Sequence, residues 1–431
     1  MKLEVFQMFR RAWLLSPPTI RVLNGSNFLM YLGFYVLVPY LALHLSGKLG
    51  WSLGLTGLLL GTRQLSQQGL TYFGGLIGDR IGWKRAIVLG VWIRALGFFG
   101  IGLAHTVPEF FAAAIISGLG GALFEPANKA AFEAFTPSKD RKTLLALRDT
   151  ISNIAFAISA LAGTLLASVD IVWLSITGGV LFIGAGEIVR RRIPTIAIPV
   201  QPATHRGVFS VMKNRAFVLY TFFLTGYFYL YTQMWITIPK VLLDLTKDTS
   251  SVTAFYAVVG ISITLFQLRL SQWLTPLPRR FGLIGLGTFL MGVSLFSLGY
   301  SEHYLLLGFC YALGMMVSNP ITFELIPRFA PRDQLAAYYG FNGYALAIGG
   351  ALSTSLGGWT YDYGHAIGFP NLPWWVCLFT GLAVFGGMQW LEGSLRASGE
   401  GAICFHFLPR RLDPIAEGKD VGSDGGTRHL A

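Results

Sequence analysis

Charged residues are scarce in this chain: 13% of its 431 residues are Asp, Glu, Lys or Arg, whereas 53% are hydrophobic. Soluble domains carry about 25% charged residues, so the composition excludes an ordinary soluble globular protein. The sequence has only 3 cysteines, Cys310, Cys377 and Cys404, and their wide spacing predicts neither a disulfide framework nor a metal site. It also lacks a nucleotide-binding loop, a metal-ligand cluster and a nucleophile triad, so we expect no cofactor and no enzymatic activity.

Long apolar runs are what the sequence has in abundance. Twelve stretches each hold about 19 or more mostly apolar residues, enough for an α-helix to cross a hydrocarbon core of about 30 Å. They begin near residues 21, 53, 86, 107, 143, 171, 216, 250, 281, 303, 334 and 372. We therefore predict an all-α integral membrane protein with twelve transmembrane helices.

The cations lie almost entirely on one side of these runs. Only Lys48, Lys240 and Lys247 fall in loops after odd-numbered spans, and every other Lys or Arg outside the spans lies at the termini or in loops after even-numbered spans. By the positive-inside rule, both termini are cytoplasmic. The net charge of +12 then reflects topology and attraction to anionic lipid rather than nucleic-acid binding. We expect a multi-pass protein of the inner (plasma) membrane, surrounded by lipid and monomeric.

The two halves of the sequence resemble each other. A shift of 194 residues pairs Gly120 with Gly314 and Pro126 with Pro320, aligning the fourth and fifth spans with the tenth and eleventh. The longest polar connection, Arg190 to Arg215, follows the sixth span. Two pseudo-symmetric six-helix bundles are typical of transporters that rock one half against the other around a midplane site.

This pattern predicts a division of the chain into five parts. They are a cytoplasmic N-terminal segment 1–19, a six-helix bundle 20–189, a cytoplasmic linker 190–215, a second six-helix bundle 216–392 and a disordered cytoplasmic tail 393–431.

The loop after the second span carries the sharpest motif. Residues 75–85 read Gly-Leu-Ile-Gly-Asp-Arg-Ile-Gly-Trp-Lys-Arg, which resembles the signature loop of the major facilitator superfamily, Gly-x-x-x-Asp-Arg-x-Gly-Arg-Lys, with Trp83 in place of Arg. The resemblance extends to multidrug exporters of that superfamily through stretches of both halves, such as 117–121 and 357–359. It implies the superfamily fold, alternating access and a conformational latch. The predicted latch residues are Gly75, Gly78, Asp79, Arg80, Gly82, Lys84 and Arg85.

The same resemblance implies a proton gradient as the energy source, although the sequence departs from drug antiporters at positions linked to coupling. Ala114 stands where they usually carry a fourth-span Arg, and Ser159-Ala160 replaces a fifth-span Gly-Pro. Proton coupling must therefore depend on other buried acids.

Ionisable and polar residues inside spans are candidate functional groups because they are costly in hydrocarbon unless they are paired or wetted. In the second span, Arg63 is followed by a helical stripe of glutamines that either lines a substrate cavity or joins helices through hydrogen bonds. Aromatic residues of the seventh span provide a second cavity wall or pack against lipid. The predicted cavity residues are Asn27, Arg63, Gln64, Gln67, Gln68, Tyr227 and Tyr231.

The fourth span places Glu125, Lys129 and Glu133 on one helical face, since they follow one another at i, i+4 spacing. Arg148 and Asp149 of the fifth span enter the membrane from the same side. We predict a proton or charge network among these five residues, with a static ion cluster as the alternative.

The sequence favours a secondary transporter that exports amphipathic small molecules, such as drugs, in exchange for protons. Two alternatives stay open. Uptake of a small anionic metabolite would use the mid-span Arg63. A polytopic membrane enzyme would require convergent acids or a metal motif that the sequence does not contain.

Overall fold

The computed structural model describes residues 13–14, 16–137, 140–166, 170–194, 211–248, 250–274, 276–331 and 335–398, and their regular structure is helical. The N-terminal half contains α2 (Pro18–Leu43), η1 (His44–Lys48), α3 (Leu53–Gln64), η2 (Leu65–Gly69), α4 (Thr71–Ile81), α5 (Trp83–Leu103), α6 (Val107–Phe135), α7 (Arg141–Leu166) and α8 (Ile171–Arg192). The C-terminal half contains α10 (Arg215–Thr232), η4 (Gln233–Trp235), α11 (Thr237–Thr246), α12 (Ser250–Leu274), α13 (Arg280–Leu298), α14 (Tyr304–Glu324), α15 (Ile326–Phe329), α16 (Leu335–Ala366) and α17 (Leu372–Ala397).

The helices begin within about one turn of the starts expected from the apolar runs. Among the described residues, 8 helices are long and apolar enough to cross a membrane. Segment 53–81 falls outside this group because it is divided into α3, η2 and α4. The eleventh span is long, since α16 continues to Ala366 and includes Asp362.

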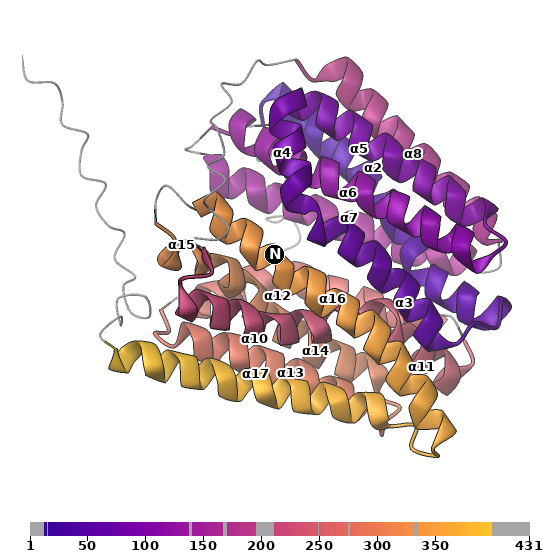
Figure 1. Cartoon of the computed structure of the whole chain (residues 1–431), viewed down its shortest axis with the longest axis vertical. Helices are drawn as coiled ribbons and strands as arrows, with labels where there is room; N and C mark the ends of the chain where they lie inside the picture. Colours follow the sequence, from indigo (N-terminus) through magenta and orange to yellow (C-terminus); the bar gives the residue numbers. More distant parts are fainter. Residues whose placement is uncertain are drawn as a thin grey trace, which may run out of the picture.

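Buried apolar side chains of the described residues form two clusters, one in each half of the chain. The first draws on residues 20–193 together with Ile236, and the second on residues 211–395 together with Phe156. Figure 1 shows the same separation, with α2 to α8 (indigo to magenta) gathered in one part of the molecule and α10 to α17 (salmon to yellow) in the other. Ile236 and Phe156 each pack into the core of the opposite half.

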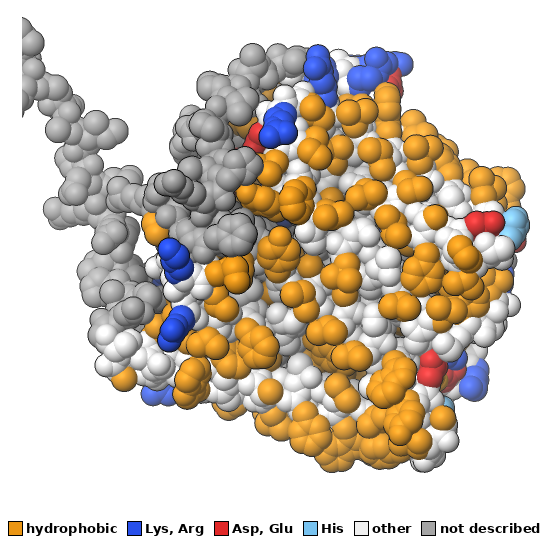
Figure 2. Space-filling view, in the orientation of Figure 1, with side chains coloured by type: hydrophobic (Ala, Val, Ile, Leu, Met, Phe, Trp, Pro, Cys, Tyr) orange, Lys and Arg blue, Asp and Glu red, His pale blue; other side chains and the backbone are white. Residues whose placement is uncertain are grey.

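The surface matches a multi-pass membrane protein. Figure 2 shows a broad apolar and neutral face between two margins, with the charged side chains gathered at those margins. Large apolar side chains such as Phe222, Trp273 and Leu306 are strongly exposed, which an aqueous surface would not favour. A lipid bilayer accommodates this apolar surface because its hydrocarbon core solvates apolar side chains.

The predicted internal repeat has a geometric counterpart in helix packing. A Cβ added at Gly120 would lie 2.4 Å from the backbone nitrogen of Arg94, and one added at Gly314 would lie 3.0 Å from that of Met291. Both glycines thus let two neighbouring helices, α5 with α6 and α13 with α14, approach closely. Arg94 and Met291 occupy matching positions, so the N-terminal half has a cation where the C-terminal half has an apolar side chain.

Candidate functional site

The segment predicted as the second span is broken at its polar residues. α3 changes at Leu65 into the π-helical turn η2, and α4 begins at Thr71 after Leu70 adopts φ −102° and ψ 2°. Single π-helical turns widen a helix and often occur at functional sites. Here the turn contains Gln67 and Gln68, whose side chains both reach α6.

Arg63, near the end of α3, is only 7% exposed. Its Nη1 donates to Gln67 Oε1 at 3.0 Å and its Nη2 donates to Gln64 Oε1 at 3.3 Å. Its Cζ lies 5.2 Å from the centre of the Phe34 ring of α2, within the range of a cation–π contact. Within the described residues, this guanidinium therefore contacts amide oxygens and a ring face but no carboxylate.

Glu125 of α6 completes a chain of polar contacts. Its Oε2 accepts hydrogen bonds from Gln67 Nε2 at 3.1 Å and Gln68 Nε2 at 3.4 Å. Its Oε1 accepts from Lys129 Nζ at 3.0 Å, which is also an i, i+4 ion pair. We call the series Arg63, Gln67, Glu125 and Lys129 the polar chain. The structure thus brings the predicted glutamine stripe against the predicted acid, although their role in binding cargo stays a prediction.

Arg94 of α5 is a further buried cation to which sequence reasoning gave no role. It is 3% exposed, and its Cζ lies 4.9 Å from the Phe34 ring centre, 5.4 Å from that of Phe124 and 5.3 Å from that of Phe182. Its side chain makes no hydrogen bond or ion pair with any described residue, and its Nε is buried without a partner. The signal was present in the sequence, because an Arg inside an apolar span is itself a functional candidate.

The remaining predicted cavity residues lie apart from the polar chain. Asn27 is buried, and its Oδ1 accepts a hydrogen bond from Asn128 Nδ2 at 2.6 Å, which joins α2 to α6. Tyr227 is fully buried in the C-terminal core, whereas Tyr231 is half-buried, with its ring centre 6.1 Å from that of Tyr227. In this conformation Tyr227 packs in the core, and a cavity role is left to Tyr231.

The predicted charge network is only partly assembled. Glu125 and Lys129 are paired, but Arg148 instead places its Cζ 5.2 Å from the centre of the Phe132 ring. Glu133 is exposed and makes no ion pair with another described side chain. The side chain of Asp149 lies outside the described residues. Glutamines of the second span, rather than Arg148, are the further partners of Glu125.

The two halves of the chain meet along α3 and α16. The Asp362 carboxylate accepts from the backbone nitrogens of Leu53 at 3.1 Å and Gly54 at 2.6 Å, at the first turn of α3. Ser52 Oγ accepts from the next free donor, Leu55 N, at 3.1 Å. A carboxylate is favourable here because the first turn of a helix has unpaired N–H groups and a partial positive charge.

Glycines make this contact very close. A Cβ added at Gly57 would lie 1.8 Å from the Thr354 carbonyl oxygen, and one added at Gly358 would lie 2.1 Å from that of Leu53. No side chain fits at such distances, so the two helices touch through their backbones. At the other end of α16 the approach is looser, since a Cβ at Gly340 would lie 3.8 Å from Tyr72 Cδ2 of α4.

An aromatic cluster also connects the halves. Tyr35 of α2 stacks on Trp235 of η4 with ring centres 5.9 Å apart, and Phe156 of α7 lies 5.6 Å from Tyr256 of α12. Trp235 also contacts Phe34, the ring shared by Arg63 and Arg94, at 6.3 Å. The cations of one half therefore border aromatic surface from the other.

The predicted latch loop joins α4 to α5 through Gly82, whose φ of +88° favours glycine. A Cβ at the predicted latch residues Gly75 and Gly78 would make ordinary contacts of 3.7 and 3.4 Å, so neither gives a very close helix approach. Gly74 has that role instead, since a Cβ there would lie 2.0 Å from the Ala122 carbonyl oxygen. All three glycines of α4 border α6, and Gly74 makes the closest approach.

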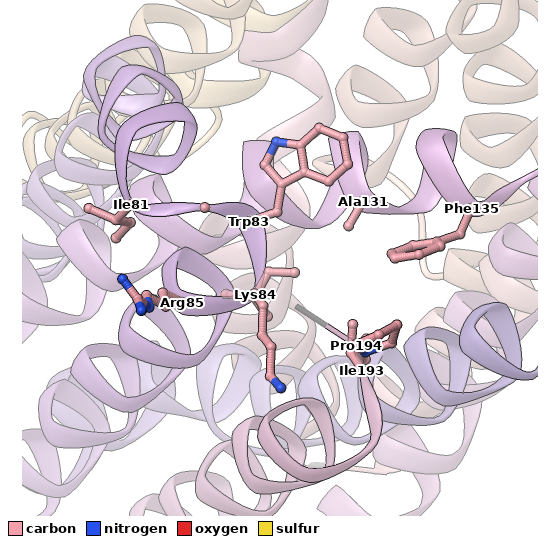
Figure 3. Close-up of a pocket in the computed structure, with 10 residues that line it drawn as sticks. Ile81, Trp83, Lys84, Arg85, Ala131, Phe135, Ile193 and Pro194 are labelled. Carbon is pink, nitrogen blue, oxygen red and sulfur yellow. The ribbon is translucent and has the colours of Figure 1, made fainter. Parts of the chain in front are cut away.

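The charged latch residues have no ion-pair partner among the residues that the structure describes. Asp79, Arg80 and Arg85 are exposed, and within the described residues none of the three forms an ion pair, with Glu133 or with any other side chain. Lys84 and Arg85 border a cavity of about 30 Å³ together with Ile193 and Pro194. Figure 3 shows Arg85 turned away from Ile193 and Pro194 while Lys84 extends beside them. The cavity has room for about one water molecule and is too small for a substrate.

Asp79→Asn is expected to reduce transport at least about tenfold at unchanged abundance. The Asp79 carboxylate forms no ion pair with a described residue in this conformation, in which the two halves touch near the start of α3. It is therefore available to form one when the halves close instead at the end where α4 meets α5. A charge-assisted hydrogen bond is worth about 1.5 to 3 kcal/mol, enough for such a shift. Flux in membrane vesicles is the measurement, and Asp140→Asn, the same change at the same end, is the control. Wild-type flux in the Asp79 variant would show that the motif is only a turn.

Asp362→Ala is expected to weaken the contact between α3 and α16, whereas Asp362→Asn largely preserves it. Asparagine caps a helix about as well as aspartate, while Ala removes the acceptor at a cost of about 0.5 to 2 kcal/mol. Spin labels at the exposed Leu49 and Ile367 would report the separation of the halves at this end. The long-distance population should increase in the Ala variant alone. Equal distances in both variants would contradict a capping role.

Comparison with known proteins identifies the family. The profile of the Major Facilitator Superfamily matches residues 23–354. The chain belongs to the major facilitator superfamily. The multidrug resistance protein MdtH of Yersinia enterocolitica is 33% identical over 375 residues, which cover 85% of this chain and 92% of that protein. MdtH of Yersinia pestis is likewise 33% identical over 378 residues, with the same coverage. The resemblance predicted from the sequence is confirmed, and this is a transporter family rather than an enzyme family.

Solved structures of major facilitator proteins share the fold. The nucleoside transporter NupG superposes with a TM-score of 0.71 at 13% identity, covering 87% of this chain and 99% of that one. An auto-inhibited peptide transporter of the POT family gives a TM-score of 0.73 at 14% identity, covering 92% and 98%. At such identities the likeness concerns the fold and carries no information on cargo.

Proposed function

We propose that this protein is a secondary active transporter that exports amphipathic small molecules, including drugs, in exchange for protons. The observation that carries the proposal is the polar chain from Arg63 to Lys129, which joins a broken helix to α6 inside an otherwise apolar bundle. Such groups are costly in a membrane and mark substrate or ion pathways. The 33% identity to MdtH favours drugs over other cargo.

The architecture of the proposal is twelve membrane spans in two six-helix bundles, 20–189 and 216–392, with the linker 190–215 between them. The separate apolar clusters of the two halves support this division, because each half has a core of its own. In the predicted orientation, the contact of α3 with α16 lies on the outer side of the membrane. The present conformation is then closed to the outside, and transport requires that this contact open while the latch loop closes.

Protons are the proposed energy source, and Glu125 is the proposed carrier. Its carboxylate accepts bonds from Lys129, Gln67 and Gln68, so the proton would bind when a conformational change withdraws those donors. Asp149 remains a second candidate carrier. No organic cofactor or metal is required by this mechanism.

Flux in inverted membrane vesicles tests the function. Imposing an inward-acidic gradient should drive accumulation of an amphipathic dye in vesicles containing the protein, and collapsing the gradient with a protonophore should release it. Uptake permease activity is the second candidate, and the two buried cations Arg63 and Arg94 favour it for anionic metabolites. Accumulation in whole cells, with none in inverted vesicles, would support uptake and overturn export.

The predicted orientation in the membrane can be tested with reporter fusions. A reporter active only in the cytoplasm should work when fused within the linker 190–215 or after Arg396, because cations concentrate on that side. The same reporter should fail when inserted at Gly368, in the exposed turn between α16 and α17. A periplasmic reporter at the same positions is the matched control. Cytoplasmic activity at Gly368 would overturn the topology.

A further inference from the structure

The site described above contains more positive than negative charge. Arg63 and Arg94 are buried, Lys129 is exposed, and among the described residues Glu125 is the acid of the polar chain; it already accepts hydrogen bonds from Lys129 and two glutamines. Neither Arg63 nor Arg94 forms an ion pair with any described carboxylate, and the Nε of each is buried without a partner. A buried cation without a counter-ion is unfavourable, so an anion beside these two guanidiniums would be stabilised.

The two guanidiniums lie beside the same ring and the same glutamine. Arg63 and Arg94 contact the same ring, Phe34, at 5.2 and 4.9 Å from its centre. Gly121 borders both Gln67 and Arg94, since a Cβ there would lie 2.7 Å from Gln67 Cδ and 3.0 Å from Arg94 Nη1. Because Gly121 has no side chain, Arg94 can lie beside the Gln67 amide, which accepts a hydrogen bond from Arg63. An anion that displaced Gln67 from Arg63 would meet both guanidiniums.

The aromatic residues beside the two arginines indicate what kind of molecule would bear the anionic group. Phe34 also contacts Trp235 at 6.3 Å, and Trp235 stacks on Tyr35, so aromatic surface begins directly beside the two cations. The C-terminal half offers no second cation at the matching place, where Met291 replaces Arg94. One end of the site is therefore suited to negative charge and the other to flat apolar groups.

We propose that the cargo recognised at this site is an amphipathic anion, with a carboxylate or similar group held by Arg63 and Arg94 and an aromatic body against Phe34, Tyr35 and Trp235. The inference rests on the proposed transport function and narrows its substrate class. Arginine suits this role because its planar donors bind a carboxylate in a bidentate manner. Binding of the anion would free Gln67, which also bonds Glu125, and would thereby connect cargo to the proposed proton carrier.

Binding of a matched probe pair to purified protein in lipid nanodiscs tests the site. The probes are radiolabelled 2-naphthylacetate and its neutral amide, which differ in charge but share the aromatic body. Wild type should bind the carboxylate about tenfold or more tightly than the amide, the factor expected for one charge-assisted hydrogen bond. Arg63→Gln and Arg94→Gln should each remove this preference, chiefly by weakening binding of the carboxylate. Arg269→Gln, an exposed position on α12, is the control.

The outcomes separate this inference from the transport function. Equal affinity of wild type for both probes, or an unchanged preference in the two Gln variants, would overturn the anion site. If the Gln variants bind neither probe, Arg63→Lys and Arg94→Lys decide: a retained preference for the carboxylate supports the site, and a lost one overturns it. If the protein binds the anion but neither probe shows gradient-driven flux in vesicles, the export proposal is contradicted and the anion site is not. If the amide shows gradient-driven flux and the protein has no preference for the carboxylate, the anion site is contradicted and the export proposal is not.

Discussion

Glu125→Gln is expected to abolish gradient-driven accumulation of substrate while preserving counterflow of the same substrate. Counterflow needs no net proton movement, so a variant that cannot exchange protons can still alternate and exchange cargo. Glutamine also keeps an acceptor for Gln67 and Gln68, which preserves the hydrogen bonds that join η2 to α6. Both assays on the same vesicles provide the measurement.

Glu133→Gln is the matched control, since it makes the same change two turns later on α6 at an exposed position. It should leave accumulation within about twofold of wild type, as expected for an exposed surface change. Full accumulation in Glu125→Gln would exclude this acid as the coupling site. Asp149→Asn would then be the next variant to examine in the same assays.

Gly57→Ala is expected to hold the halves apart at the outer end of α3 and reduce transport by about tenfold or more. The added Cβ would lie 1.8 Å from the Thr354 carbonyl oxygen, and a backbone atom cannot move away as a flexible side chain can. The contact between α3 and α16 must therefore separate, which shifts the population toward the open state. Each bundle retains its own core, so the variant should still fold and reach the membrane.

Spin labels at Leu49 and Ile367, in a background without Cys310, Cys377 and Cys404, would measure this separation. The distance should lengthen in Gly57→Ala and stay unchanged in the control Gly47→Ala, where an added Cβ meets nothing within 4 Å. An unchanged distance with normal flux would show that closure does not depend on this backbone contact.

Sequence alone determined where the helices begin and which side chains inside the spans are candidate functional groups. The apolar runs are long and local, so their starts agree with the structure. Arg63, Gln67, Glu125 and Lys129 could be found because polar residues inside apolar spans are conspicuous, and because helical spacing puts Glu125 beside Lys129. Membership of the major facilitator superfamily was also predictable from the loop at residues 75–85.

Tertiary structure alone decided how these elements meet. Arg94 joins the site because α5 packs on α6 through Gly120, and that packing turns its guanidinium toward Phe34. Asp362 caps α3 across a separation of 308 residues, a partner that no local pattern can specify. Gly74 approaches α6 more closely than Gly75 does, a difference that depends on how α4 is rotated about its axis. Helix periodicity fixes which residues share a face, but the packing of the whole chain decides what that face meets.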